Sequence, residues 1–337
     1  MKHDRGDILL GYSGGMDSTV AARRLREEGY RVVALTIDTT GDSAMLRRAR
    51  ARADAEAIEW HSVDARELFR REIVDYFIDE YCAGHTPAPC TRCNTQIKWR
   101  LLESHADECG IRHIATGHYF NIVREGASHY VACADDPTKD QSYYLWGLAQ
   151  RTLRRTVAVM GDVHKSDIRR DFEDKSESMG ICFLCGERYA DFIRRNTTRF
   201  AEGDIVDIDG NIVGRHAGLP FYTIGQKRGE GIPAGSCIVA VDPQRNRIVA
   251  GRDEDLYRKT VVIGHCNIVD RSELRAADIT AKIRGIGRNP QLPVAVTALG
   301  EGYRVYFADE AWAPAVGQPL GLYRGGRVIG GGIITNF

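Results

Sequence analysis

The chain has 337 residues, of which 43% are hydrophobic and 27% charged, and its formal net charge is zero. Its length allows two or three domains, and its composition is that of an ordinary globular protein. No apolar run approaches the roughly 20 residues of a membrane-spanning helix, and the N-terminal residues lack the apolar core of a signal peptide. We therefore expect a cytoplasmic protein with no membrane partner. Nine cysteines in such a compartment indicate metal or thiol chemistry, not a disulfide scaffold.

A glycine-rich stretch at residues 11–18 separates a predicted strand at residues 8–10 from a predicted helix at residues 18–28. Gly29 stands where a helix end in the left-handed conformation favours glycine. A glycine-rich turn between strand and helix leaves main-chain N–H groups free and aims the positive helix end at the same point, which predicts a phosphate site. The stretch lacks the Gly-Lys-Ser/Thr ending of the P-loop. Its form, Ser-Gly-Gly-x-Asp-Ser, resembles the pyrophosphate loop of ATP pyrophosphatases.

Strands and helices continue to alternate after this loop. Further strands are predicted at residues 31–37, 60–63 and 112–116, and helices at residues 43–58, 64–84 and 93–110. Asp64 and Glu67 predict a capping box for the second of these helices, and Ser166 predicts the cap of a later one. This order predicts a doubly wound parallel sheet, in which ligands bind at the carboxyl ends of the strands.

The pattern changes near residue 196, where glycines begin to recur at turn spacing between short β-branched runs. Asp209-Gly210 between two such runs is typical of a hairpin. We therefore expect two small all-β modules after the α/β region. The predicted domains are residues 1–195, 196–255 and 256–337.

Four of the cysteines form two Cys-x-x-Cys pairs about 90 residues apart, Cys90/Cys93 and Cys182/Cys185. Two prolines predict a loop at residues 85–93, and Cys93 then begins a helix beside Arg92, where the thiolate is favoured. Paired Cys-x-x-Cys spacing suits zinc or an iron–sulfur cluster. A relay of thiols without metal and a set of cysteines with no role are the alternatives. The five isolated cysteines are interpreted as small apolar fillers: Cys82, Cys109, Cys133, Cys237 and Cys266.

Eight motifs in one order carry a resemblance to a known family, at residues 11–18, 86–98, 115–119, 139–143, 178–183, 186–188, 223–229 and 330–334. In them the chain resembles the tRNA-uridine 2-sulfurtransferases, also called tRNA-specific 2-thiouridylases, over nearly its whole length. The resemblance implies a PP-loop fold of the adenine nucleotide α-hydrolase type, followed by two β modules, the last barrel-like. It also implies ATP-dependent replacement of the C2 oxygen of uridine 34 in tRNA by sulfur, with release of AMP.

The resemblance assigns roles to particular residues. ATP binding falls on Gly11, Tyr12, Ser13, Gly14, Gly15, Met16, Asp17, Ser18, Ile37 and Gly117, with Asp17 also a Mg²⁺ ligand. Cys182 would carry a persulfide, and Cys93 would be its partner nucleophile. Contact with the tRNA anticodon stem-loop falls on Ala88, Pro89, Cys90, His118, Lys139, Asp140, Gln141, Arg284 and Gly285. The sulfur would come from a persulfide-carrying donor protein or from sulfide.

The chain departs from the family pattern at two positions. Cys90 stands where the family has an aspartate, and Gly285 stands where it has an aromatic residue. A zinc ion or [4Fe–4S] cluster on all four paired cysteines would prevent Cys182 from also carrying a persulfide, unless the cluster itself delivered sulfide. Because the net charge is zero, we expect tRNA to bind to a local basic face made by Lys139, Arg151, Arg154, Arg155, Arg194, Arg195 and the β modules.

Two other functions fit parts of the sequence. An ATP pyrophosphatase acting on a small molecule would share the glycine-rich stretch, but it would need neither the cysteine pairs nor the β modules. An RNA-binding protein with a structural metal ion on the cysteine pairs would keep the fold without catalysis. The intact Ser13, Asp17 and Ser18 argue against such a loss.

Overall fold

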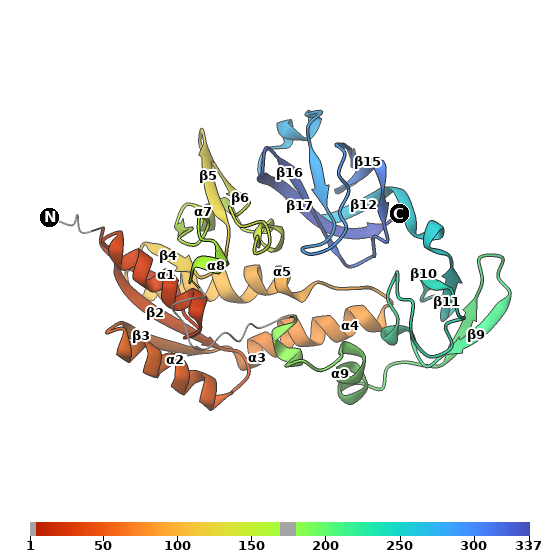
Figure 1. Cartoon of the computed structure of the whole chain (residues 1–337), viewed down its shortest axis with the longest axis horizontal. Coiled ribbons are helices and arrows are strands. Elements are labelled where there is room, and N and C mark those ends of the chain that lie inside the picture. Colours follow the sequence, from red (N-terminus) through yellow and green to blue (C-terminus); the bar gives the residue numbers. More distant parts are fainter. Residues whose placement is uncertain (1–4, 169–179) are drawn as a thin grey trace. The chain divides into compact units, whose positions relative to one another are not determined.

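The computed structural model describes residues 5–168 and 180–337, which fall into two compact units (Figure 1). Unit 1 comprises Met1–Glu72, Cys90–Ser178 and Gly326–Ile329, and unit 2 comprises Ile73–Pro89, Met179–Gly325 and Gly330–Phe337. No helix in the described part of the chain is both long and apolar enough to cross a membrane.

Unit 1 is built on a five-stranded parallel sheet with the strand order β3-β2-β1-β4-β7. Its strands are β1 (Asp7–Gly11), β2 (Arg31–Asp38), β3 (Glu59–Asp64), β4 (His113–Thr116) and β7 (Thr156–Val157). The order runs outward from β1 to β3 and then returns to β4, so a switch point lies between β1 and β4. The predicted doubly wound parallel sheet is confirmed.

Helices cover both faces of this sheet (Figure 1). The α1 and α2 helices pack on one face, where Leu25 and Ala53 join the core that contains Val32. The α6 helix contacts β1 and β4, with Leu102 against Gly11; the right-handed crossover from β3 back to β4 places it on the opposite face. The helices of unit 1 are α1 (Met16–Glu27), α2 (Ser43–Ala55), α3 (Arg66–Phe69), α5 (Pro89–Cys93), α6 (Arg100–Glu108), α7 (Gln150–Leu153) and α8 (Lys165–Ile168).

Two helical runs each contain a π-helical segment. Arg70–Asp75 lies between α3 and α4 (Tyr76–Cys82), and Asn94–Trp99 lies between α5 and α6. Such segments are rare and occur often at functional sites. The second one directly follows Cys93.

Unit 2 is mostly antiparallel β structure, as predicted from residue 196 onward. Its four-stranded sheet has the order β10-β11-β8-β9, and a larger sheet follows the path β13-β16-β17-β12-β15-β14. A hydrogen bond of 2.7 Å from Val294 N–H to the Ile279 carbonyl links the two ends of that path, so the sheet curls toward closure. The elements are α9 (Tyr189–Asn196), β8 (Gly203–Val206), β9 (Ile212–His216), β10 (Cys237–Asp242), β11 (Arg247–Gly251), β12 (Tyr257–Ile268), β13 (Thr280–Lys282), β14 (Val294–Leu299), β15 (Gly302–Trp312), β16 (Pro319–Arg324) and β17 (Arg327–Asn336).

A hairpin of unit 1, β5 (Asn121–Glu125) and β6 (Ser128–Ala132), pairs with the first residue of β17 through Arg327 and Ala132. Arg327 also donates to Glu125 at 2.8 Å and lies over the ring of Tyr130. These contacts explain why the first residues of β17 belong to unit 1.

The predicted capping box at Asp64 and Glu67 is wrong. Asp64 ends β3, paired with Asp38 of β2, and its carboxylate accepts bonds from the N–H and the guanidinium of Arg66. These bonds lower the pKa of Asp64 to about 2. The α3 helix therefore begins at Arg66, after Ala65, without a side-chain cap.

Two further helices begin earlier than predicted. The α5 helix begins at Pro89, because proline is tolerated at a first helical position, and Cys93 therefore lies one turn inside the helix. The α8 helix begins at Lys165, so Ser166 lies within it. The rest of that predicted helix lies outside the described residues.

Candidate functional site

The glycine-rich stretch forms the loop between β1 and α1 at the carboxyl edge of the sheet. Gly15 precedes α1 and provides no side-chain cap, so the N–H groups of the first helical turn remain available to a ligand. Ser13 Oγ lies 3.3 Å from Ser18 Oγ and accepts a bond from the N–H of Gly15. Ser18 donates to the Gly15 carbonyl at 3.0 Å. The loop holds its own shape and leaves a helix N-terminus open to an anion.

The other predicted ATP-binding residues of β1, α1 and β2 lie around this loop. Tyr12 is buried, with its N–H bonded to the Leu35 carbonyl at 2.8 Å. Met16 begins α1, and Ile37 is the next-to-last residue of β2. The bond of Tyr12 to Leu35 ties the start of the loop to β2.

Gly14 can be replaced only with strain, and we expect Gly14→Ala to destabilise unit 1 more than the same change at a glycine with open space around it. Its φ is +73°, and an added Cβ would lie 2.6 Å from the Cα of Ala49, which is fully buried. The left-handed conformation costs roughly 1–2 kcal/mol for a non-glycine residue, and the overpacking adds about 1–3 kcal/mol.

Gly126 is the matched control, because its φ is +59° and an added Cβ would contact nothing within 4 Å. Urea denaturation of Gly14→Ala and Gly126→Ala should therefore differ by the overpacking cost. Equal losses of unfolding free energy would contradict the tight contact between the loop and α2.

Gly117 brings the end of β4 against the start of α1. A Cβ at Gly117 would lie 3.0 Å from Ser18 N and 3.2 Å from Ser18 Cα. The adjacent Thr116 pairs with Gly11 across the two strands. The end of β4 therefore lies directly against the first turn of α1 at the switch point, where a doubly wound sheet binds its ligand.

Asp17 lies at the centre of a network that the sequence did not predict. Tyr119 Oη donates to Asp17 Oδ1 at 2.6 Å, and Lys165 forms an ion pair with the same oxygen. The Lys165 side chain is only 9% exposed, and its main-chain N–H is held by Asp136 at 3.1 Å. Hydrogen bonding from Thr138 holds the pKa of Asp136 below its usual range, so the carboxylate that holds the Lys165 main chain stays ionised. A largely buried ammonium group is therefore paired with a carboxylate of the first turn of α1.

Asp17 also fits the predicted role of a Mg²⁺ ligand. Its side chain is 39% exposed, and the bonds from Tyr119 and Lys165 both fall on Oδ1. Mg²⁺ is usually held by one or two carboxylates together with substrate phosphates and water. One exposed carboxylate beside a phosphate-binding loop meets that requirement.

Cys90 and Cys93 lie on α5 in unit 1. Cys93 is buried, and Cys90 is partly buried beside Tyr144, whose pKa is raised by burial and then by the charge of Cys90. Asn94 is 2% exposed and donates to the Tyr144 carbonyl at 3.0 Å, while its Oδ1 has no hydrogen-bond partner. The hydroxyl of Thr91 is buried and unpartnered as well. Unsatisfied buried polar atoms are costly, and these two leave hydrogen-bonding capacity next to Cys90 and Cys93.

Arg92, predicted to stand beside the Cys93 thiol, is engaged by a carboxylate. Its guanidinium donates to the Glu72 carbonyl at 2.7 Å and to the Glu72 carboxylate at 2.8 Å. This ion pair holds the end of α5 against the π-helical segment that contains Glu72.

His118 follows β4 and lies in the same unit as Cys93. Its Nε2 lies 3.3 Å from Lys98 Nζ and its Nδ1 lies 2.9 Å from Thr116 Oγ1. Because an ammonium group can only donate, Nε2 accepts and Nδ1–H donates to Thr116. Burial and then the positive charge of Lys98 hold the pKa of His118 well below its usual range. His118 is therefore a neutral hydrogen-bonding group near the cysteine helix.

This depressed pKa predicts a pH dependence of stability. Between the folded pKa of His118 and its unfolded value of about 6.5, the unfolded chain binds a proton that the folded chain does not. The unfolding free energy should therefore fall as the pH drops below about 6.5, by at most about 1.4 kcal/mol per pH unit for this group. Urea denaturation of the wild type and of His118→Gln, at neutral and mildly acidic pH, should show the smaller loss in the variant. Parallel pH profiles would contradict the assignment.

The second cysteine pair lies in unit 2 on a tight turn. Cys182–Leu184 is one turn of 3₁₀ helix, and Cys185 has a φ of +48°, which is rare for a non-glycine residue. Phe183 packs edge-on against Phe77 at 5.2 Å, and Leu184 is buried. The apolar residues hold the turn in the core and leave both thiols exposed.

Comparison with known proteins identifies the family. Three family models match in succession: tRNA methyl transferase HUP domain at residues 6–186, tRNA methyl transferase PRC-barrel domain at residues 190–252, and Aminomethyltransferase beta-barrel domain at residues 257–334. The chain is 40% identical over 355 residues to a protein of Bacteroides fragilis named tRNA-specific 2-thiouridylase MnmA 1, covering 97% of each. The chain belongs to the tRNA-specific 2-thiouridylase family. Proteins with this name from Cytophaga hutchinsonii and Clostridium botulinum are 36% and 33% identical, each match covering 98% of both chains.

Several residues that the resemblance to the 2-thiouridylases assigns to tRNA contact also have structural partners. Asp140 accepts bonds from the N–H groups of Ala134 and Ser142, and Gln141 exchanges hydrogen bonds with Tyr119. Asp140 and Gln141 therefore shape the segment that contains Lys139. Ala88 and Pro89 lead into α5.

Arg284, in unit 2, is tied to the same unit. Its guanidinium donates to the Trp312 carbonyl at 2.8 Å and to the Ala313 carbonyl, and it lies over the Trp312 ring. These bonds stabilise the loop that includes Gly285. Of the basic residues predicted to bind tRNA, Arg151 and Arg154 are exposed in unit 1, whereas Arg155 pairs with Asp107 at 2.8 Å.

Cys109 departs from its predicted role as an apolar filler, because it is exposed. Cys237 is buried as that interpretation requires. Because Cys109 is exposed at the end of α6, its side chain does not fill a hydrophobic core.

Proposed function

We propose that the chain catalyses ATP-dependent 2-thiolation of uridine 34 in tRNA, forming AMP and pyrophosphate. The observation that carries the proposal is the similarity to proteins named tRNA-specific 2-thiouridylases over 97% of the chain, which includes the stretch that contains the open glycine loop. A small-molecule ATP pyrophosphatase would not need the two cysteine pairs or the β modules, and a non-catalytic RNA-binding protein would not need the Asp17–Lys165 pair.

The first step makes the C2 oxygen of uridine a leaving group. That oxygen attacks the α-phosphate of ATP, the bond to pyrophosphate breaks, and AMP becomes joined to the oxygen. The loop amides and the α1 N-terminus would hold the departing pyrophosphate, and Lys165 would neutralise its charge. Asp17 would hold Mg²⁺, which screens the phosphates. His118, neutral beside Lys98, would be a hydrogen-bonding group for the uridine.

The second step delivers sulfur. The outer sulfur of a persulfide on Cys182 attacks C2, and the C2–O bond breaks to release AMP. The Cys93 thiolate then attacks Cys182 Sγ, so the S–S bond to the uridine sulfur breaks and a Cys93–Cys182 disulfide forms. An external thiol reductant returns both cysteines to thiols. The exposed position of Cys182 supports loading of its thiol by a donor protein, whose persulfide gives up its outer sulfur and leaves as a thiol. Sulfide would instead enter before reduction, by attacking Cys182 Sγ of the Cys93–Cys182 disulfide, which forms the Cys182 persulfide and releases the Cys93 thiol.

A metal centre on the same cysteines is a second form of the proposal. Each pair offers two thiols from one turn, the spacing of half a tetrahedral thiolate site, so Cys90, Cys93, Cys182 and Cys185 are suited to hold zinc or a [4Fe–4S] cluster. When bound, a cluster would supply sulfide in place of the persulfide. The aspartate of the family is replaced by Cys90, which favours this form over the relay.

We assign residues 1–195 to catalysis, 196–255 to a central β domain, and 256–337 to a barrel-like domain that contacts tRNA through the region of Arg284 and Gly285. The matches of the three family models support these divisions. Lys139, Arg151 and Arg154 would contact the anticodon stem-loop, and the protein would act in the cytoplasm.

Hydrolysis of ATP with and without bulk tRNA tests the proposal. We expect AMP, not ADP, as the product, and an increase in its formation when tRNA is added. Formation of AMP without any response to tRNA would favour a small-molecule substrate. Failure to consume ATP, with tRNA still bound, would favour the non-catalytic alternative.

A further inference from the structure

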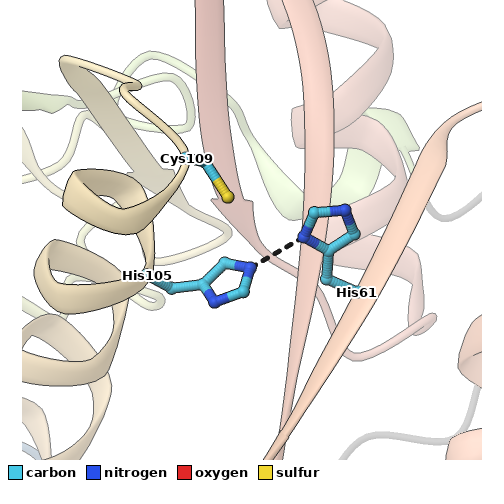
Figure 2. A group of neighbouring side chains, drawn as sticks. All are labelled: His61, His105 and Cys109. Atoms are coloured by element: carbon cyan, nitrogen blue, oxygen red, sulfur yellow. Dashed lines mark hydrogen bonds between the residues drawn. The ribbon is translucent and has the colours of Figure 1, made fainter.

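Three side chains with metal-ligating atoms meet in unit 1, away from the residues assigned above. His61 comes from β3, and His105 and Cys109 come from α6 and the residue that follows it (Figure 2). His105 and Cys109 are four residues apart, so they lie on one face of the helix. One ligand atom from each of the three lies within 4.8 Å of the other two.

Each imidazole has one nitrogen facing the other ring and its second nitrogen facing a carboxylate. His61 Nδ1 and His105 Nε2 point at each other across 2.7 Å (Figure 2). The other nitrogen of each ring faces a carboxylate, with Glu59 at 3.0 Å from His61 Nε2 and Glu108 at 3.5 Å from His105 Nδ1. Metal-ligating histidines almost always have such a partner on the second nitrogen, which fixes the ring and raises its basicity.

We propose that His61, His105 and Cys109 bind a divalent cation of the zinc type. Two imidazoles and a thiolate are nitrogen and sulfur ligands that suit Zn²⁺ and not Mg²⁺ or Ca²⁺, and three protein ligands leave a fourth position for water. The cation enters from solvent at the exposed Cys109. It displaces the proton shared by the two imidazoles and the proton of the thiol.

Binding requires a small adjustment of the rings. In tetrahedral coordination with Zn–N bonds of about 2.0–2.1 Å, two nitrogen ligands lie about 3.4 Å apart. The imidazole nitrogens must therefore separate from their present 2.7 Å. The side chains of His61 and His105 are 30% and 21% exposed, so the rings have room to turn.

The site would tie the edge of the sheet to a helix. β3 is the outermost strand beside β2, and His61 lies two strands across from Gly11, because it pairs with Leu35, which pairs with Gly11. A cation joining His61 to His105 and Cys109 would hold β3 against α6. This role is independent of the proposed reaction, and its test needs neither ATP nor tRNA.

Titration of the reduced full-length protein with Co²⁺, a spectroscopic substitute for Zn²⁺, tests the proposal. Cys90, Cys93, Cys182 and Cys185 are first replaced together by serine, so that they cannot bind the probe. We expect one equivalent of Co²⁺ with the strong visible bands of tetrahedral coordination and a thiolate-to-metal band in the near ultraviolet. Zn²⁺ should displace it and raise the midpoint of thermal unfolding.

Single changes in that background assign the ligands. Cys109→Ser, at an exposed position, should remove the thiolate band, and His61→Ala or His105→Ala should weaken Co²⁺ binding at least tenfold. His164→Ala, an exposed histidine of the same unit, is the matched control and should change neither. Absence of tight Co²⁺ binding, or bands that persist in all three ligand variants, would overturn the proposal and leave a hydrogen-bonded histidine pair.

Discussion

Asp17→Asn is expected to reduce ATP-dependent thiolation at least about 100-fold, the size of effect seen when one electrostatic contact to a reacting group is lost. Asparagine keeps an oxygen for the hydroxyl of Tyr119, which donates to Asp17 at 2.6 Å. It removes the negative charge that Lys165 now faces and that Mg²⁺ would use. The affinity for tRNA should stay near that of the wild type, because the loop faces phosphate and not RNA. Single-turnover thiolation and tRNA binding would be measured on the same preparations.

Asp162→Asn is the matched control for this variant. Asp162 also pairs with a basic residue, accepting from Arg24 of α1 at 2.6 Å, but its side chain is 61% exposed. Exposed pairs contribute little to stability, so thiolation should be unchanged. Wild-type turnover by Asp17→Asn would remove the nucleotide site from the glycine loop.

Lys165→Met tests the other half of the pair. Because Lys165 and Asp17 are in contact, the losses caused by the two changes should not add in the double variant. Additive losses would mean that the two residues act separately.

The parallel sheet could be predicted because its strands are short buried runs with helices between them. β1 and β2 are continuous apolar runs, and residues such as Leu9, Ala34 and Val32 are only 0–5% exposed. Gly29, predicted to end the first helix, has a φ of +96°. Apolar runs and helix-ending glycines depend only on neighbouring residues, and the sequence alone is therefore enough to predict them.

The position of Lys165 could not be predicted, because its partner Asp17 is 148 residues away. A lysine in a basic stretch is typical of a solvated helix face. Here burial decides its role, and burial depends on how α8 packs. The helix starts show the same limit: Asp64 fits a capping pattern, but the pairing of β3 with β2 keeps it in the strand.

One part of the His61, His105 and Cys109 cluster can be predicted from the sequence, and the other part cannot. The spacing of His105 and Cys109 on a predicted helix is visible in the sequence. His61 is 44 residues from His105, and only the packing of α6 against the sheet brings the two rings together. Isolated cysteines are usually interpreted as fillers, and Cys109 shows that exposure must be known first.

Serine substitutions of the paired cysteines are expected to have the largest effects on sulfur transfer. Cys93→Ser and Cys182→Ser should abolish thiolation in either form of the proposal, because each removes a reacting thiolate or a cluster ligand. Adenylation should survive both changes, since Cys93 and Cys182 do not contact the glycine loop in the proposed reaction. Release of pyrophosphate and thiolation of tRNA, measured separately, would show that the block lies in the second step.

Cys185→Ser and Cys90→Asp decide between the metal centre and the relay. If the four thiolates share a metal, both changes should lower metal content and thiolation together, because a tetrahedral site loses one of its ligands. If thiols alone act, Cys185→Ser should keep most activity, and Cys90→Asp, which restores the family's residue, should be active. Cys82→Ser is the control: Cys82 lies at the end of α4 outside both pairs, and burial raises its pKa, so it stays a thiol. We expect the metal-dependent result, because the replacement of an aspartate by Cys90 completes a second Cys-x-x-Cys pair. An active Cys90→Asp protein without bound metal would assign the sulfur transfer to the relay.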